Sequence, residues 1–294
     1  MSHLLACQHT ACYNPSVIMR FVSGIIGIPL LIVLLLVGHG LPFVLGVWAL
    51  AILGLNEFYR GARKIGSRPQ EWLGYACTLV FMFSARERYQ TSVLAIPAVL
   101  TVLVLTSLAI ELLRPDRAPL QNLGATFLGV VYCGWLFSYL VALRSVSGDI
   151  RVVCLNRMVP IGAWLVLFVV FAAWAADTGA YLIGRKWGSR RIAPVLSPGK
   201  TWEGTVAGIV WSLAMSVVMG SLIAMPWVHI IILGIGIALI SLVGDLAESS
   251  MKREIGIKDF GSLLPGHGGI LDRFDGLLFV APLFYYYVTL VMGY

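Results

Sequence analysis

The chain has 294 residues, of which 59% are hydrophobic and only 12% are charged, and its mean hydropathy is +0.88. Soluble domains are about 45–50% apolar and about 25% charged, so this composition excludes an ordinary soluble globular protein and favours a bundle of membrane-spanning helices. The formal net charge of +7 does not indicate nucleic-acid binding, because the sequence has no basic stripe interleaved with aromatic residues.

Apolar windows of about 17–25 residues recur along the chain and predict an all-α, polytopic integral membrane protein with about nine transmembrane helices. The expected spans are 21–38, 41–58, 72–84, 92–113, 121–143, 159–176, 204–224, 228–247 and 274–293. The third is short for a straight crossing, so it could instead be half-buried or be extended by the preceding residues RPQEW.

This pattern divides the chain into three expected regions. They are a flexible N-terminal extension at 1–19, an N-terminal transmembrane region at 20–158, and a C-terminal catalytic transmembrane region at 159–294.

Lys and Arg residues divide unequally between the two sides of such a bundle. With a cytoplasmic N-terminus and nine crossings, 16 of the 21 fall on the inner side, as the positive-inside rule requires. The five on the outer side are Arg86, Arg88, Arg144, Arg151 and Arg157. The compact nine-span form favours a multi-pass protein of a bacterial inner membrane.

Acidic residues gather in the last third of the chain, where the predicted topology places them at the inner face. Eight of the 14 lie between positions 177 and 275: Asp177, Glu203, Asp245, Glu248, Glu254, Asp259, Asp272 and Asp275. Charged loops are ordinary in membrane proteins, so the spacing of these acids must decide whether they form a site.

Two pairs of carboxylates have helical spacing at the ends of predicted spans. Asp245 and Glu248 are three residues apart on one helix face, and Asp272 and Asp275 are three apart where the last helix begins. Such carboxylates could converge on a hard divalent cation such as Mg²⁺, which prefers oxygen ligands. Capping of the last helix is an alternative role for Asp272.

Glycine-rich and basic residues beside these acids suit phosphate groups. The segment LLPGHGG places Gly268 and Gly269 next to His267, and glycines allow close approach of backbone N–H groups to an anion. The segment SPGKTWEG precedes a helix, an arrangement that also favours anions, although a glycine turn or an interfacial lysine would explain each segment separately. The phosphate-binding candidates are Ser197, Lys200, Thr201, Lys252, Arg253, Lys258, Gly268, Gly269 and Arg273.

The segment that begins at Ser250 and contains KREIGIKDFGSLLPGHGGILDRFD closely resembles the signature of the phosphatidate cytidylyltransferases, the CDP-diacylglycerol synthases. The segments WAADTGAYLIGRKWG and SPGKTWEG are also similar to that family, and the specific resemblance covers about residues 170–280. It implies that CTP and phosphatidate react to give CDP-diacylglycerol and pyrophosphate, with Mg²⁺ required. It also implies a second cation, K⁺, and a homodimer.

The resemblance implies metal ligation by Asp245 and Asp272, with Asp275 and Asp177 as further candidates. Catalytic roles then fall to Asp245, Asp272, Lys252, Arg253 and His267. His267 could donate a hydrogen bond to pyrophosphate or merely order its glycine loop. Glu248 could contact the metal ligands without binding the metal itself. No strong general base is expected, since a phosphate monoester is already largely ionised near pH 7.

Two other classes of protein share some of these features. A transporter would favour charges in the middle of the membrane and paired repeats, neither of which is clear, since Glu57 and Glu111 lie at predicted helix ends. A CDP-alcohol phosphotransferase would carry DGxxAR followed by spaced GxxxDxxxD, which this sequence lacks. A cytidylyltransferase acting on another lipid phosphate is excluded only poorly.

Overall fold

The computed structural model describes residues 27–87, 95–114, 118–152, 157–261 and 268–294. The predicted N-terminal extension and His267 therefore lie outside the described residues. A helix at Gly27–Leu36 leads through a short 3₁₀ turn, Val37–Gly40, into α2 at Leu41–Lys64. It is followed by α3 at Glu71–Arg86 and α4 at Ala95–Leu113.

The next rod is continuous although its hydrogen-bond pattern changes. It comprises α5 at Pro119–Gly129, a π-helical turn at Val130–Trp135, and α6 at Leu136–Arg144. The remaining helices are α7 at Ile161–Trp187, α8 at Trp202–Ser221, α9 at Trp227–Ile255, and α10 at Leu271–Tyr286 with a final π turn at Tyr287–Val291.

Six helical rods are long and apolar enough to cross a membrane among the residues that the structure describes. They start at Leu41, Pro119, Ile161, Trp202, Trp227 and Leu271. The helices near Gly27–Leu36 and Ile96–Leu112 are apolar but shorter. The protein is therefore a polytopic helical membrane protein, and the number nine stays a prediction.

Two small antiparallel hairpins depart from the predicted all-α fold. Strands β1, Asp149–Val152, and β2, Arg157–Pro160, pair between α6 and α7. Strands β3, Arg191–Ala193, and β4, Ser197–Thr201, pair between α7 and α8. Each hairpin lies in a connection between helices, and only the last two residues of β2 fall within a predicted span, 159–176. The backbone groups of the strands pair with each other instead of within a helix.

Two helices continue well beyond their predicted ends. The apolar windows ended at residues 176 and 247, but α7 runs to Trp187 and α9 to Ile255. At about 1.5 Å per residue, α9 is about 44 Å long, which exceeds a hydrocarbon core of about 30 Å. Hydropathy underestimated the length of both helices because their last turns are polar. Those turns carry charged residues that the sequence analysis singled out.

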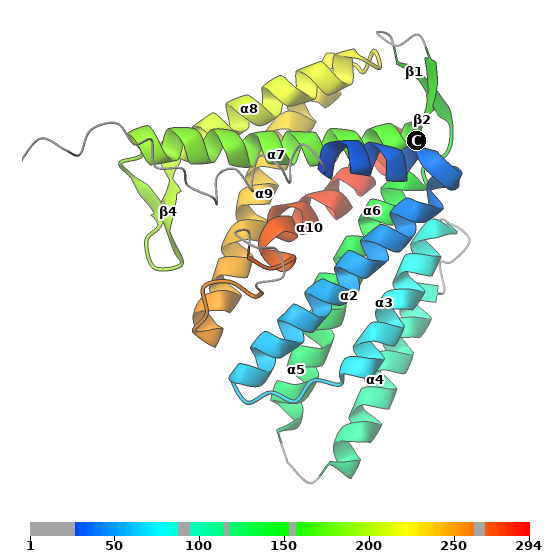
Figure 1. The fold of residues 1–294 in the computed structure, drawn as a ribbon, viewed down its shortest axis with the longest axis vertical. Helices are drawn as coiled ribbons and strands as arrows, with labels where there is room; N and C mark the ends of the chain where they lie inside the picture. The colour runs from blue at the N-terminus through cyan, green and yellow to red at the C-terminus, as the bar shows by residue number, and fades with distance from the viewer. Residues whose placement is uncertain (1–26, 88–94, 115–117, 153–156, 262–267) are drawn as a thin grey trace, which may run out of the picture.

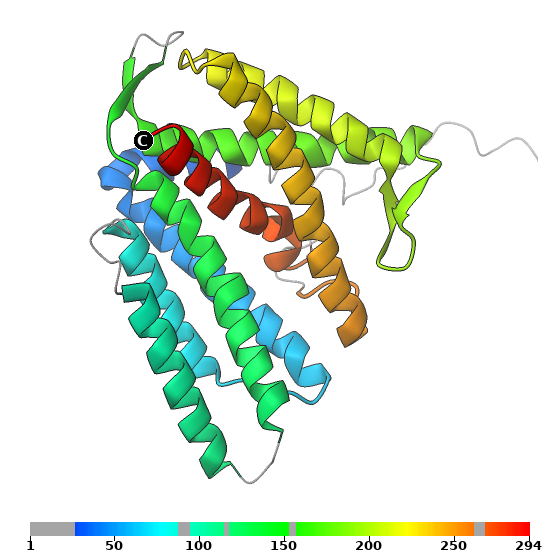
Figure 2. The ribbon, with the colours of Figure 1, turned by 180° about the vertical axis from the view of Figure 1, so that it is seen from behind.

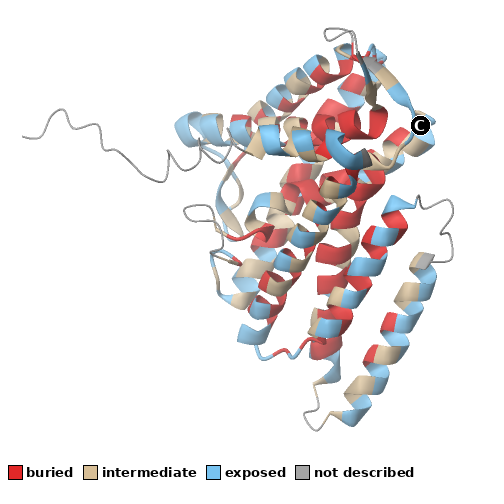
Figure 3. Ribbon diagram, turned by 45° about the vertical axis from the view of Figure 1, so that its right-hand side comes forward, coloured by how far each residue is buried: buried red, intermediate tan, exposed pale blue. Residues whose placement is uncertain are grey.

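The core lies around the first half of α7 and the neighbouring α6 and α10. Leu165 and Phe168 of α7 are fully buried, and the ring of Phe168 packs 5.4 Å from that of Phe284 in α10, measured between centroids. Figure 3 shows buried residues concentrated in these helices, whereas α4 at the edge is mostly exposed. A helix that is apolar all round and buried is expected at the centre of a membrane bundle.

Small residues allow α7 and α8 to pack closely, and the two helices lie side by side in both views of the ribbon (Figures 1 and 2). A Cβ atom on Gly204 would lie 2.8 Å from the carbonyl oxygen of Ala180, and one on Gly208 would lie 3.0 Å from that of Ala176. Such contacts are typical of helix pairs in membranes. The pairing brings the C-terminal half of α7 beside the start of α8.

Candidate functional site

The β3–β4 hairpin places Lys200 beside a group of acids that we call the acidic cluster: Asp177, Asp245, Glu248, Asp272 and Asp275. Thr201 caps α8, because its hydroxyl oxygen accepts a hydrogen bond of 3.1 Å from the Gly204 amide. This cap fixes the end of β4, and the ammonium group of the preceding Lys200 makes an ion pair with the Asp245 carboxylate of α9. The predicted phosphate-binding and metal-binding segments therefore meet.

Lys252 links α9 to the start of α10. Its Nζ donates to Glu248 Oε2 at 3.2 Å, one turn earlier on α9, and to Asp272 Oδ1 at 2.9 Å on α10. Glu248 is fully buried and Asp272 nearly so. Because both acids are removed from water, this shared ammonium group is the principal positive charge between the two helices.

Asp272 also holds the loop before α10. Its Oδ2 accepts hydrogen bonds from the Phe260 amide at 3.0 Å and the Gly269 amide at 2.8 Å. The N–H groups that it satisfies belong to the loop before the helix, so helix capping in the ordinary sense is not its role. The contacts orient Asp272 and place the described end of the glycine loop against it.

Glu57 of α2 is a site residue that the sequence reasoning did not include. Its Oε2 accepts a hydrogen bond of 3.1 Å from the Leu271 amide at the start of α10, and the side chain is buried. Gly261 and Gly269 leave room for it, since a Cβ atom on either would overlap its carboxylate. The position of Glu57 near the end of an apolar run was the available signal.

Asp177 of α7 completes the cluster from the other side. Its Oδ1 accepts a hydrogen bond of 3.2 Å from the Ser241 hydroxyl of α9, and Lys200 and Asp275 both act on it electrostatically. Asp275 also interacts with Glu248. The four predicted metal ligands thus come from the C-terminal halves of α7 and α9 and from the start of α10.

A pocket of about 220 Å³ opens beside this cluster, between α7, α8, α9 and the hairpin. Its polar lining includes Asp177, Ser197, Lys200 and Thr201, and its apolar lining includes Ala238 and Leu242. Polar groups at membrane depth are tolerated where they line a cavity or bind a ligand. The pocket can therefore receive a group that has both a charged and an apolar part.

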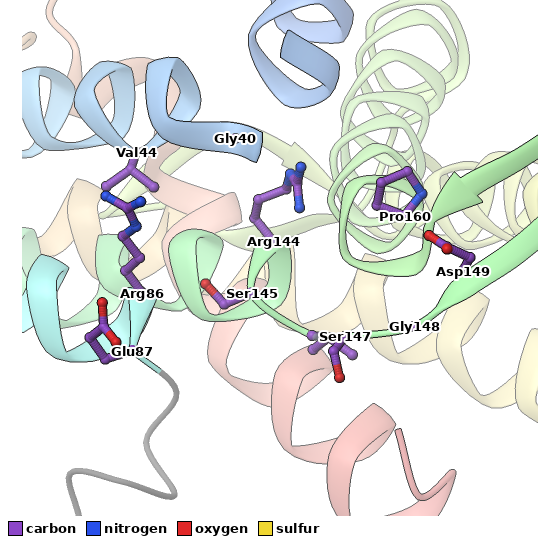
Figure 4. A pocket seen from close by; sticks show the side chains of 11 residues that line it. Gly40, Val44, Arg86, Glu87, Arg144, Ser145, Ser147, Gly148, Asp149 and Pro160 are labelled. Atoms are coloured by element: carbon purple, nitrogen blue, oxygen red, sulfur yellow. The ribbon is translucent and has the colours of Figure 1, made fainter. Parts of the chain in front are cut away.

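A larger pocket, of about 510 Å³, lies at the opposite end of α7 (Figure 4). Arg86, Arg144 and Asp149 line it, and Arg144 Nε donates to the Leu35 carbonyl oxygen at 3.0 Å. It contains none of the predicted site residues. Two of the five cations assigned to the outer side therefore lie together, at the end of the bundle away from the acidic cluster.

Other predicted residues lie at the margin of the cluster. Arg253 Nε donates to the Leu196 carbonyl oxygen at 3.1 Å, so this bond holds the turn of the hairpin and involves no acidic side chain. Lys258 and Arg273 are exposed, and Gly268 has a φ of +79° beside Asp272. Their roles in binding phosphate stay predictions.

The chemistry of the cluster suits a hard divalent cation. Its donors are carboxylate oxygens, and Glu248 Oε1 is buried with no hydrogen-bond partner among the described residues. In the part of the chain that the structure describes, no three His, Cys, Asp or Glu side chains are grouped closely enough to hold a metal. Lys200 and Lys252 instead supply the positive charge beside the acids.

The fold and the site define a polytopic helical membrane protein in which the β3–β4 hairpin, α9 and α10 bring carboxylates and lysines together. A family model described as the cytidylyltransferase family matches residues 18–291. The chain belongs to this family.

Two curated relatives are similar over most of their length, and a third is similar over about half of its length. A phosphatidate cytidylyltransferase of Synechocystis is 35% identical over 290 residues, which cover 93% of this chain and 97% of the relative. That of Bacillus subtilis is 28% identical, covering 92% of this chain and 97% of its own length. That of Haemophilus influenzae is 42% identical over a shorter segment, 45% of this chain and 48% of the relative.

Proposed function

We infer that this chain is a phosphatidate cytidylyltransferase, which transfers CMP from CTP to phosphatidate and releases pyrophosphate. The observation that carries this inference is the full-length similarity to enzymes of that name. The site supports it, because Lys200 and Lys252, from two different elements, form ion pairs with acidic side chains, and Lys200 lines a pocket with polar and apolar walls.

The reaction is a substitution at phosphorus. An oxygen of the phosphatidate monoester attacks the α-phosphorus of CTP, a new P–O bond forms, and the bond to the β-phosphate oxygen breaks with pyrophosphate as the leaving group. The attacking oxygen is already ionised, so the chain needs no strong base. Its task is to lower the repulsion between two anionic substrates and to hold them in line.

The lysines and acids divide this task. Lys200 reaches the pocket from β4 and is positioned to bind phosphate oxygens of either substrate. Lys252 is held by Glu248 and Asp272 and provides a second fixed positive charge. We propose that Asp245, Asp272, Asp275 and Asp177 supply carboxylates for Mg²⁺, which one or two of them would hold together with substrate phosphates, where it would neutralise phosphate charge. K⁺ as a second cation is also part of this proposal.

The membrane arrangement is proposed from the charge distribution. We place the N-terminus and the acidic cluster on the cytoplasmic side of a bacterial inner membrane, with nine crossings and the C-terminus outside. CTP then reaches the site from the cytoplasm, while the acyl chains of phosphatidate remain in the lipid. The active protein is proposed to be a homodimer.

The activity can be tested directly with the purified full-length protein in detergent. Radiolabelled CTP and phosphatidate with Mg²⁺ should give a lipid-soluble cytidine product and free pyrophosphate in equal amounts. A product that forms without phosphatidate, or no lipid-soluble product with an intact protein, would contradict the assignment.

A further inference from the structure

Four cations lie together at the end of α7 and the start of the β3–β4 hairpin. Arg185, Lys186, Arg190 and Arg191 are all exposed, and we call them the basic hairpin face. Between residues 178 and 244 the sequence contains five Lys or Arg residues and a single acid, Glu203. This region therefore has a strong local excess of positive charge.

The one nearby acid is used to hold the backbone of the hairpin. Glu203 accepts hydrogen bonds from the Ser189 hydroxyl at 2.6 Å and from the Arg190 amide at 3.3 Å. The Trp202 amide donates in turn to the Arg190 carbonyl oxygen at 2.9 Å. The side chains of Arg190 and Arg191 form no ion pair with any acid in the described ranges. The backbone is thus fixed while both guanidinium groups remain available.

Large apolar side chains surround these cations. Trp187 is 58% exposed, Trp202 is 57% exposed and Val195 is 85% exposed. Lys186 Nζ lies 4.5 Å from the centre of the Trp187 ring. Tryptophan together with Lys and Arg is typical of the membrane interface, where anionic lipid headgroups meet water.

The same hairpin leads from this surface to the site. In the register of β3 and β4, Arg191 pairs with Thr201, and the adjacent Lys200 contacts Asp245. Arg253 holds the other end of the hairpin through the Leu196 carbonyl. Figure 1 shows the hairpin projecting from the end of α7. Surface cations and the pocket lysine thus belong to one anchored unit.

We propose that the basic hairpin face is a loading site, which takes the phosphate headgroup of phosphatidate from the bilayer surface and presents it to the pocket that contains Lys200. The proposal rests on the function inferred above. A phosphate monoester carries a charge of about −1.5 to −2 near neutral pH, whereas a phosphodiester lipid carries about −1. A group of cations therefore favours phosphatidate over the more abundant diester lipids.

The test uses the full-length protein in nanodiscs of neutral phosphatidylcholine that contain a varied fraction of phosphatidate. The double substitution Arg190→Gln and Arg191→Gln should raise the apparent KM for phosphatidate at least about fivefold. The reason is that each Lys or Arg near the membrane surface increases the affinity for an anionic lipid by about that factor. The kcat at saturating phosphatidate and the KM for CTP should stay within about twofold of the wild type. Replacing both arginines by lysine should retain the wild-type KM.

Two controls distinguish binding of phosphatidate at the basic hairpin face from a nonspecific effect of positive surface charge. Lys64→Gln removes an exposed cation at the end of α2, on the same side as the site, and should leave the KM for phosphatidate unchanged. Raising the ionic strength at a fixed K⁺ concentration should raise the KM of the wild type and have little effect on the double variant, because salt screens exposed charges.

The outcomes distinguish the two inferences. If the wild type is active and the double variant keeps its KM, or if Lys64→Gln raises the KM equally, the loading site is overturned while the activity stands. A fall in kcat with an unchanged KM would also overturn it, because the hairpin would then act on the chemistry through Lys200. A wild type with no turnover would overturn the activity and the loading site together.

Discussion

At the scale of single residues, the site is a set of charges that compensate each other, partly exposed at Lys200 and Asp245 and buried around Lys252. Lys200 pairs with Asp245, and Lys252 is shared between Glu248 and Asp272. Removing one member of a buried pair leaves an uncompensated charge, whereas exposed pairs contribute little. Substitutions in the cluster should therefore alter activity and sometimes stability, and the two effects must be measured separately.

Asp245→Asn should lower kcat at least about 100-fold, because it removes a charge that positions Lys200 and is assigned to Mg²⁺. The variant should still elute as a single folded species in detergent. The measurement is Mg²⁺-dependent formation of the lipid-soluble cytidine product. Glu254→Gln, at an exposed position on the same helix, is the matched control and should be close to wild type. Normal activity in Asp245→Asn would refute the assignment.

Glu57→Ala should destabilise the protein by about 1–3 kcal/mol, because the Leu271 amide loses its buried acceptor. The measurement is the midpoint of thermal unfolding in detergent. Glu71→Ala is the control, since Glu71 makes a partly exposed ion pair with Arg63, and such pairs contribute at most about 1 kcal/mol. An equal loss in both variants would show that Glu57 has no special structural role.

At the scale of elements, helix ends position the chemistry. α9 extends past the apolar window and ends at Gly256, which has a φ of +79° and whose amide donates to the Arg253 carbonyl. This left-handed residue is a common helix stop and favours glycine. It fixes where the last turn ends, and that turn carries Lys252 and Arg253.

Gly256→Ala should lower the stability of the protein by about 1 kcal/mol, because alanine resists a left-handed conformation even though no atom obstructs its Cβ. Gly236→Ala lies within the same helix, also meets no neighbouring atom, and should be neutral or slightly stabilising. Thermal unfolding of both variants provides the comparison. A destabilisation of Gly236→Ala as large as that of Gly256→Ala would contradict the role of the cap.

At the scale of the whole molecule, the two pockets lie at opposite ends of α7. Arg86 and Arg144, which we assigned to the outer side, line one, and Asp177 and Lys200, which we assigned to the inner side, line the other. The orientation of the two ends in the membrane stays a prediction from the positive-inside rule.

A cysteine at position 190 should react with a membrane-impermeant thiol reagent only from the cytoplasmic side, whereas one at the exposed position 147 should react only from outside. Labelling of intact cells and of inverted membrane vesicles measures this, with the parent protein as the background control. Cys77 and Cys133 are buried and should contribute little to that background. The reverse pattern would invert the proposed topology.

The sequence by itself determined that the protein lies in a membrane and where most of its helices are. Its motifs also predicted the type of reaction. Apolar windows of membrane length have one stable solution in lipid, which is the helix, because every backbone polar group must be satisfied internally. Acids with helical spacing next to a glycine-rich, basic loop are unusual in so apolar a chain. Together with the family resemblance they predict Asp245, Asp272, Asp275 and Asp177 as metal ligands, and that assignment stays a prediction.

Only the tertiary structure decided which charges meet. The pairing of Lys200 with Asp245 joins positions 45 residues apart, and the bond from Leu271 to Glu57 joins positions 214 residues apart. Such contacts depend on how the helices pack, and on glycines that let α7 and α8 approach, so no local pattern predicts them. The spacing of Asp245 and Glu248 predicted that α9 continues past its apolar window, whereas the polar last turns of α7 were found only in the structure.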